Sequence, residues 1–180
     1  MIYGGIDVGK RSCKIALIDK KVVYIGEYDK SVFFKVYAVG IDAPLTLPEN
    51  GMLRECEKDL LKLGIKLFPS GAPFFKEIAL IGMKIAEELR DLGLKVYEVY
   101  PFASRFVMNI APKAKKRTKR GLEEIKIALS NYIEIPELSH DEIDAVISAL
   151  TVREYVEGRG SSVVGEGEII LPRTFFSFGR

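Results

Sequence analysis

Three aspartates have apolar neighbours on both sides in the sequence. Asp7, Asp42 and Asp144 each follow an isoleucine and precede a valine or an alanine. A carboxylate that leaves water loses several kcal/mol of solvation unless hydrogen bonds, a basic partner or a metal ion compensate. Each aspartate alone could be a helix cap or a turn residue. Together the three predict one shared acidic site.

The region around Asp144 has the spacing of an amphipathic helix. Asp141 and Asp144 lie on one stripe of this helix, and Ala145 and Ala149 are small enough to let it approach a sheet closely. An acidic first turn that complements the helix dipole also explains Asp141, but it suits the deeper Asp144 less well. His140 is predicted either to shuttle a proton or orient water in the site, or to be a helix-start residue.

Four carboxylates are enough to bind hard divalent cations. Mg²⁺ binds a few carboxylates and keeps waters and phosphate oxygens as its other ligands. Two such ions about 3.5 to 4 Å apart can activate a water and stabilise a leaving oxygen in phosphoryl transfer. Asp7, Asp42, Asp144 and Asp141 are therefore predicted to bind two metal ions, and phosphodiester hydrolysis is the reaction class that this site suits.

Positive charge is concentrated in one short segment. Lys+Arg exceeds Asp+Glu by only 27 − 25 = 2 over the 180 residues, so the whole molecule has little general attraction for nucleic acid. Residues 113–120 nevertheless contain six cations, and Arg105 lies nearby. This basic run predicts a phosphate-binding patch, although a solvated loop and helix entry would have the same composition. Its members are Lys113, Lys115, Lys116, Arg117, Lys119 and Arg120.

Strands and helices must bring these side chains together. Runs rich in β-branched residues predict three hairpin-connected strands and then a fourth that ends in Asp42-Ala43-Pro44. Helical spacing and a further β run follow, so the expected order is β-β-β-β-α-α-β-α-α with a short edge strand near the end. This order predicts an α/β fold whose mixed sheet of five to six strands has helices on both faces, with the site at the carboxyl ends of strands. The predicted strands are 2–7, 14–18, 22–28, 33–41, 95–100 and 168–172, and the predicted helices are 52–63, 74–92, 121–132 and 141–156.

Several other classes of protein are excluded or disfavoured. Cys13 and Cys56 with a single histidine cannot supply four ligands for structural zinc. Residues 4–10 fit a Gly-rich phosphate loop, but Arg11 follows where Ser or Thr is needed, and a strand follows where a helix is needed. No apolar stretch approaches the roughly 20 residues of a membrane span. We therefore expect a cytoplasmic protein of one domain over residues 1–180, partly flexible from about residue 158, and the absence of Gln and Trp suggests a thermophilic source.

Five short motifs in order resemble the domain-of-unknown-function family 429, described as predicted nucleases of RNase H fold. The resemblance covers roughly residues 2–172. It is carried by Gly5-Ile6-Asp7-Val8-Gly9, Ile41-Asp42-Ala43-Pro44, Arg54-Glu55-Cys56-Glu57 with Gly64-Ile65 and Phe68-Pro69, Glu98-Val99-Tyr100-Pro101, and His140-Asp141-Glu142-Ile143-Asp144-Ala145.

This resemblance implies an RNase H-like fold and a nuclease that uses Mg²⁺ or Mn²⁺. Asp7 would bridge the metal ions, and Asp42 and Asp144 would complete the site. The Asp141/Asp144 pair is similar in spacing to RuvC-type Holliday-junction resolvases, which implies a structured DNA substrate. Glu98 would either replace a catalytic glutamate found elsewhere in ribonuclease H or be structural.

The predicted nucleic-acid contacts extend beyond the basic run. Arg54 would contact a phosphate or pair with an acidic neighbour, and Lys10 and Arg11 follow the first strand, in a segment that also resembles the first phosphate loop of actin-like ATPases. Three hypotheses follow. The leading one is a metal-dependent nuclease acting on DNA or RNA, with a homodimer as one assembly that would suit branched substrates. The second is an inactive nucleic-acid-binding or interaction module of the same fold, and the third is an actin-like phosphotransferase.

Overall fold

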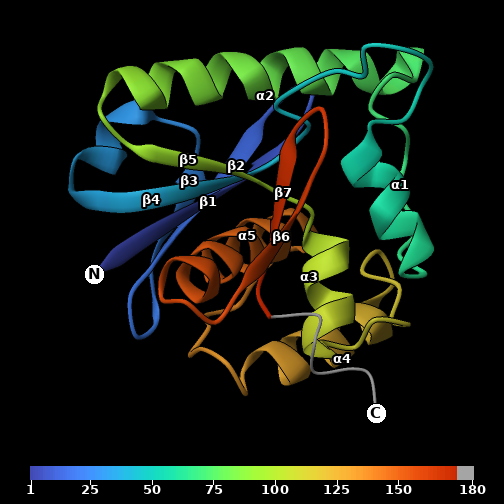
Figure 1. Cartoon of the computed structure of the whole chain (residues 1–180). Helices are drawn as coiled ribbons and strands as arrows, with labels where there is room; N and C mark the ends of the chain where they lie inside the picture. Colours follow the sequence, from blue (N-terminus) through green and yellow to red (C-terminus); the bar gives the residue numbers. More distant parts are fainter. Residues whose placement is uncertain (174–180) are drawn as a thin grey trace.

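One mixed sheet of seven strands organises the chain (Figure 1). The computed structural model describes residues 1–173, and the expected flexibility of the tail falls partly on residues 174–180, outside the described part. The strand order is β3-β2-β1-β4-β5-β7-β6. The strands are β1 (Ile2–Val8), β2 (Cys13–Ile18), β3 (Val22–Glu27), β4 (Val36–Asp42), β5 (Lys95–Val99), β6 (Ser161–Val164) and β7 (Glu168–Leu171).

The sheet combines an antiparallel and a parallel half. β1, β2 and β3 form the predicted antiparallel meander, whereas β4 pairs with β1 in parallel and β5 pairs with β4 in parallel. The carboxyl ends of β1, β4 and β5 therefore meet at one edge of the sheet. This confirms the predicted α/β class.

Helices cover both faces of the sheet, as Figure 1 shows. On one face, α2 (Pro73–Asp91) packs against apolar side chains of β1, β2 and β4. On the other face lies α5 (His140–Val156), which is buried continuously over residues 143–152 because α3 (Pro101–Met108) and α4 (Lys119–Leu129) pack against its outer side. Continuous burial of α5 explains why its sequence is apolar on more than one face. The remaining helical elements are the 3₁₀ helix η1 (Lys30–Lys35) and α1 (Glu55–Lys62).

The chain after residue 158 differs from the prediction. Residues 158–162 were expected to be a loop and 168–172 an edge strand, but β6 and β7 form an antiparallel hairpin and β7 pairs in parallel with β5. β7 is therefore an interior strand, β6 is the edge, and the sheet has seven strands instead of five or six. The serines and glycines of this segment have low strand propensity, and the pairing with β5 outweighs it.

A helix after β5 was also missing from the predicted order. Pro101 was expected only to end the strand, yet it occupies the first turn of α3, where its fixed φ suits a helix and its missing N–H costs nothing. None of the helices within residues 1–173 combines the length and the apolar character of a membrane span.

Candidate active site

The same three-residue sequence ends two neighbouring strands. Gly5-Ile6-Asp7 and Gly40-Ile41-Asp42 lie side by side in parallel register, so Asp7 pairs with Asp42 and Gly5 with Gly40. Because side chains alternate along a strand, each isoleucine points toward α2, and each aspartate shares the α5 face with its glycine. The register therefore places two carboxylates next to each other at the edge of the sheet.

The two glycines let α5 approach the sheet closely enough to bring in the third carboxylate. A Cβ atom at Gly5 would lie 2.0 Å from the carbonyl oxygen of Ala145, and one at Gly40 would lie 2.9 Å from that of Ser148. Only glycine fits at such a helix–strand contact. Carboxylate oxygens of Asp7, Asp42 and Asp144 lie within 4.8 Å of one another as a result. The three aspartates singled out in the sequence form one cluster, the acidic triad.

The acidic triad concentrates negative charge in partly buried surroundings. The pKa of Asp7 is raised to about 6, mainly by burial, with Lys116 opposing the rise and the nearby Asp141 carboxylate adding to it. Burial also raises the pKa of Asp42 well above its usual range, and the neighbouring Asp7 carboxylate adds to the effect. The two carboxyl groups are hydrogen-bonded to each other. Such a pair shares a proton unless a cation stabilises both charges.

The donor set of the triad fits a divalent cation. All three ligands are carboxylate oxygens, which Mg²⁺ and Mn²⁺ prefer to nitrogen or sulfur. A bound cation would also remove the cost of ionising Asp7 and Asp42 side by side, because metal charge reverses the local preference for the protonated form. The site therefore fits the metal ions predicted from the sequence.

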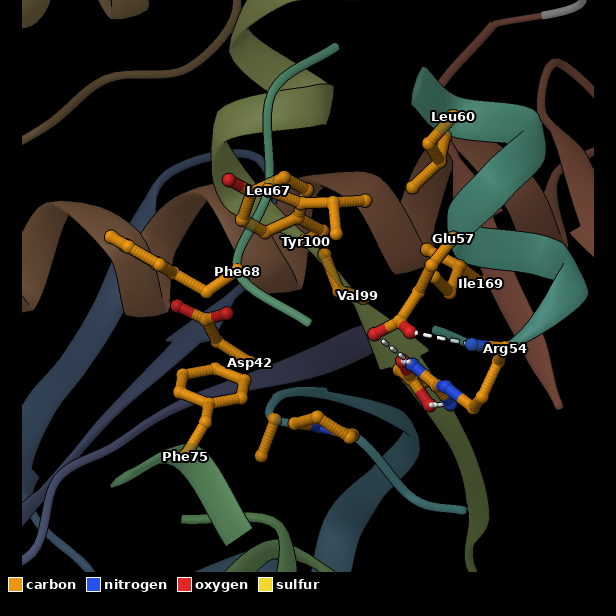
Figure 2. A pocket seen from close by; sticks show the side chains of 13 residues that line it. Asp42, Arg54, Glu57, Leu60, Leu67, Phe68, Phe75, Val99, Tyr100 and Ile169 are labelled. Carbon is orange, nitrogen blue, oxygen red and sulfur yellow. Dashed lines mark hydrogen bonds and ion pairs between the residues drawn. The ribbon is translucent and has the colours of Figure 1, made fainter. Parts of the chain in front are cut away.

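A cleft with an aromatic wall lies over the triad. Its volume is about 490 Å³, and its charged lining residues are the triad, Lys116 and Arg105. Phe68 and Phe74 have exposed fractions of 65% and 58%, and their ring centroids lie 5.8 Å apart in an edge-to-face pair. Figure 2 shows the Asp42 carboxylate with the rings of Phe68 and Phe75 on either side of it in this view. The aromatic residues that line the cleft itself are Phe68, Phe75, Tyr100 and Phe102.

Sequence reasoning did not identify these aromatic residues or the two glycines as parts of the site. The repeated Gly-Ile-Asp sequence was a usable signal, because two identical strand ends in a mainly parallel sheet can pair in register. The aromatic wall had a weaker signal, a Phe-Pro pair between two predicted helices and a Phe-Phe pair at the start of the second.

Arg54 and Glu98 form a buried ion pair next to the site. Arg54 Nη1 donates to Glu98 Oε2 at 2.8 Å and Nη2 donates to Oε1 at 2.5 Å, and neither side chain is more than 5% exposed. Figure 2 shows the bonds that Arg54 makes in this network. A fully buried guanidinium cannot reach a phosphate outside the protein. The structure corrects the prediction that Arg54 contacts nucleic acid and supports its alternative, pairing with an acidic neighbour.

Glu98 is held by the same network and not by the triad. Its Oε2 also accepts a hydrogen bond from the backbone N–H of Leu45 at 2.8 Å, so it anchors the loop that begins directly after Asp42. Burial raises the pKa of Glu98 while Arg54 opposes the rise. With its oxygens bound to Arg54 and Leu45, Glu98 is not among the clustered carboxylates, and the structure gives it the structural role instead of the catalytic one.

Arg105 is a second predicted nucleic-acid contact that the structure places in the interior. It is 4% exposed, and its guanidinium donates to the carbonyl oxygens of Ile110 at 3.2 Å and Ala114 at 3.1 Å. These bonds hold the loop between α3 and α4. Arg105 is among the residues that line the cleft, but its guanidinium is bound to backbone carbonyl oxygens, so its role is structural.

Most of the other predicted cations are exposed on the surface, and Lys116 lines the cleft. Five of the six residues of the basic run are exposed, and Lys116 is half-buried and forms an ion pair with Asp144. Lys10 and Arg11 are exposed in the turn after β1, where Lys10 pairs with Glu77 at 2.6 Å. The exposed members of the run are Lys113, Lys115, Arg117, Lys119 and Arg120.

Asp141 and His140 lie at the start of α5 and pair with each other. His140 Nδ1 is 2.6 Å from Asp141 Oδ1, and the two side chains are 44% and 48% exposed. Both groups influence the pKa of Asp7, so they lie near the triad although Asp141 is not one of its three clustered carboxylates. They are positioned at the rim of the site.

No protein-family model and no curated protein matches this chain, so membership of family 429 stays a prediction. Among solved structures, the chain is similar to RuvC from Thermus thermophilus in complex with a Holliday junction substrate. That match has a TM-score of 0.55 and 13% identity and covers 88% of this chain and 97% of RuvC. A second Thermus thermophilus RuvC structure matches with a TM-score of 0.51 and 15% identity, over 87% and 96% of the two chains. The chain therefore has the RNase H-like fold of RuvC.

Proposed function

We propose that this protein is a nuclease that hydrolyses phosphodiester bonds with the help of Mg²⁺ or Mn²⁺. The observation that carries the proposal is the acidic triad, in which two strand ends and the central helix bring three carboxylates within 4.8 Å. The RNase H-like fold supports it, because RuvC of the same fold is described with a Holliday junction as its substrate.

Different residues of the site would bind the metal ions and transfer the proton. Asp7, Asp42 and Asp144 would hold two divalent ions, which when bound lower the pKa of a water and stabilise the leaving oxygen. Through those ions the three carboxylates would set the position of the reacting phosphate in the cleft. The His140–Asp141 pair at the rim is placed to accept a proton from the site and pass it to solvent.

The surroundings of the triad suit a nucleic acid better than a small phosphate ester. Exposed cations of the basic run and of the turn after β1 can follow a phosphate backbone. The aromatic wall offers stacking surface to bases that leave a duplex. We therefore include branched DNA among the proposed substrates, and a two-fold dimer would present two such sites to a symmetric junction.

Cleavage of a substrate panel tests the proposal. The panel contains single-stranded RNA, an RNA/DNA hybrid, duplex DNA and a four-way junction, each in Mg²⁺ and in Mn²⁺. The controls are the Asp7→Asn and Asp144→Asn variants, whose folding is checked by circular dichroism. Cleavage by the wild-type protein that both variants lose supports the nuclease. Cleavage that survives in Asp7→Asn refutes it, and binding without cleavage favours an inactive nucleic-acid-binding module.

A further inference from the structure

Lys116 differs from the rest of the basic run in what it contacts. Its Nζ forms an ion pair with Asp144 Oδ2, and within residues 1–173 no other cation forms an ion pair with a triad carboxylate. The Lys116 side chain is 30% exposed and that of Asp144 is 9% exposed. The ammonium group is therefore inserted into the acidic cluster, whereas the neighbouring lysines point toward solvent.

The loop that carries Lys116 is built to hold this position. Arg105 binds the carbonyl oxygens of three loop residues, and the loop bends through left-handed backbone conformations at Asn109 (φ 56°) and Ala111 (φ 40°). The other end of the loop packs closely against the first turn of α4, because a Cβ at Gly121 would lie 2.3 Å from the carbonyl oxygen of Lys115. The conformation at Asn109 is an ordinary cap of α3, but a buried arginine and a positive φ at alanine are more than a solvated loop needs.

An ammonium group and a divalent ion compete for the same carboxylate. Lys116 interacts favourably with Asp144 and, at longer range, with Asp7 and Asp42, so it already neutralises part of the charge that attracts metal. A metal ion bound through Asp144 would place two positive groups within a few ångströms of each other. In partly buried surroundings that repulsion is large, so binding through Asp144 requires Lys116 to leave.

We propose that Lys116 is a built-in competitor for the metal ion at Asp144, so that the site binds its two divalent ions with unequal affinity. This inference rests on the proposed function. The first ion uses Asp7 and Asp42 and leaves the lysine in place. The second ion needs Asp144 and displaces the lysine toward the cleft, where a substrate phosphate is its natural partner. Phosphate binding and the second metal ion therefore favour each other.

Mn²⁺ binding measures this competition without any cleavage assay. Free Mn²⁺ is followed by electron paramagnetic resonance during titration of the full chain, at one pH and ionic strength, for wild type, Lys116→Met and Lys115→Met. Lys115→Met removes the same charge from an exposed neighbour and is the matched control. We expect wild type and Lys115→Met to bind a second Mn²⁺ at least about tenfold more weakly than the first. Lys116→Met should tighten the second step by at least about tenfold.

The outcomes separate this inference from the proposed function. Identical isotherms for Lys116→Met and Lys115→Met, with Mn²⁺ binding that Asp7→Asn weakens, overturn the competition and leave the nuclease proposal standing. Wild-type protein that binds no Mn²⁺ overturns both. If Lys116→Met does not fold, Lys116→Gln is titrated in its place. A tighter second Mn²⁺ step than in Lys115→Met then supports the competition, and an identical isotherm overturns it.

Discussion

Replacing Asp7 by asparagine should stabilise the fold at neutral pH while it removes the proposed metal site. Asp7 has a pKa of about 6 in the folded protein against its ordinary value of 3.8, because burial disfavours the charged form. The folded protein therefore holds this proton more tightly than the unfolded chain does. The resulting stability is fully present below about pH 4 and is lost as the pH rises through 6.

The size of this loss follows from the two pKa values. A difference of about 2.2 between 3.8 and about 6 corresponds to roughly 3 kcal/mol of unfolding free energy. This figure is an upper limit for Asp7 alone, because the hydrogen-bonded Asp42 shares the proton. Asparagine cannot ionise and keeps a polar group beside Asp42, so it avoids the loss.

Urea unfolding measures the effect, followed by far-ultraviolet circular dichroism because the chain has no tryptophan. In the presence of a metal chelator, the unfolding free energy of Asp7→Asn should exceed that of wild type by up to about 3 kcal/mol at pH 7.5. This difference should disappear as the pH falls toward 4. Exposed Asp91 supplies the control, since Asp91→Asn should leave the pH profile unchanged. An Asp7→Asn variant no more stable than wild type at pH 7.5 would refute the reasoning. Excess Mn²⁺ should stabilise wild type but not Asp7→Asn.

Three further substitutions test the packing around the site and the role of its aromatic wall. Gly5→Ala should destabilise the fold by about 3 kcal/mol or more in thermal unfolding, because its Cβ would overlap the Ala145 carbonyl, and normal stability would contradict the close approach of α5. Arg54→Met should cost about 3 to 5 kcal/mol by leaving Glu98 and Glu57 buried without their cationic partner, whereas Arg54→Met/Glu98→Leu should recover part of that loss in urea unfolding, because Glu57 stays buried. A double variant as unstable as the single one would show that the pair itself is needed. Phe68→Ala should weaken binding of single-stranded DNA, in fluorescence anisotropy, by about 1 to 3 kcal/mol at constant stability. Phe34→Ala, 78% exposed on η1 and away from the cleft, should bind as wild type does, and equal affinity of both variants would exclude the aromatic wall from the interface.

The sequence predicts the acidic triad well because two strong constraints act on it. An aspartate between apolar residues must have a partner, and strand ends of a mainly parallel sheet meet at one edge. Asp7 and Asp42 satisfy both conditions, and helical spacing adds Asp144. These constraints are local or follow from topology, so no knowledge of tertiary contacts is needed.

Residues whose roles depend on tertiary contacts could not be placed from the sequence. Arg54 and Glu98 lie 44 positions apart in the chain, and only the tertiary fold brings the N-cap of α1 to β5. Arg105 has the composition of a phosphate contact, but burial and the geometry of three carbonyl oxygens give it a structural role. The strand Ser161–Val164 likewise depends on its partner β7, because two serines and the glycines around them outweigh the strand propensity of its two valines.

The role of Lys116 could not be predicted from charge composition. The six cations of the basic run are equivalent in the sequence, and five of them are exposed as a solvated or phosphate-binding segment would be. The sixth is set apart by its ion pair with Asp144, and its loop contains a positive φ at Ala111 and is held by the buried Arg105. Positive φ at Ala111 has no signature in the sequence, since alanine seldom adopts it. Backbone geometry therefore determines which lysine of the basic run reaches the proposed metal site. Lys116→Met and Lys115→Met remove the same charge from the two positions, so a difference between them reports the position and not the charge.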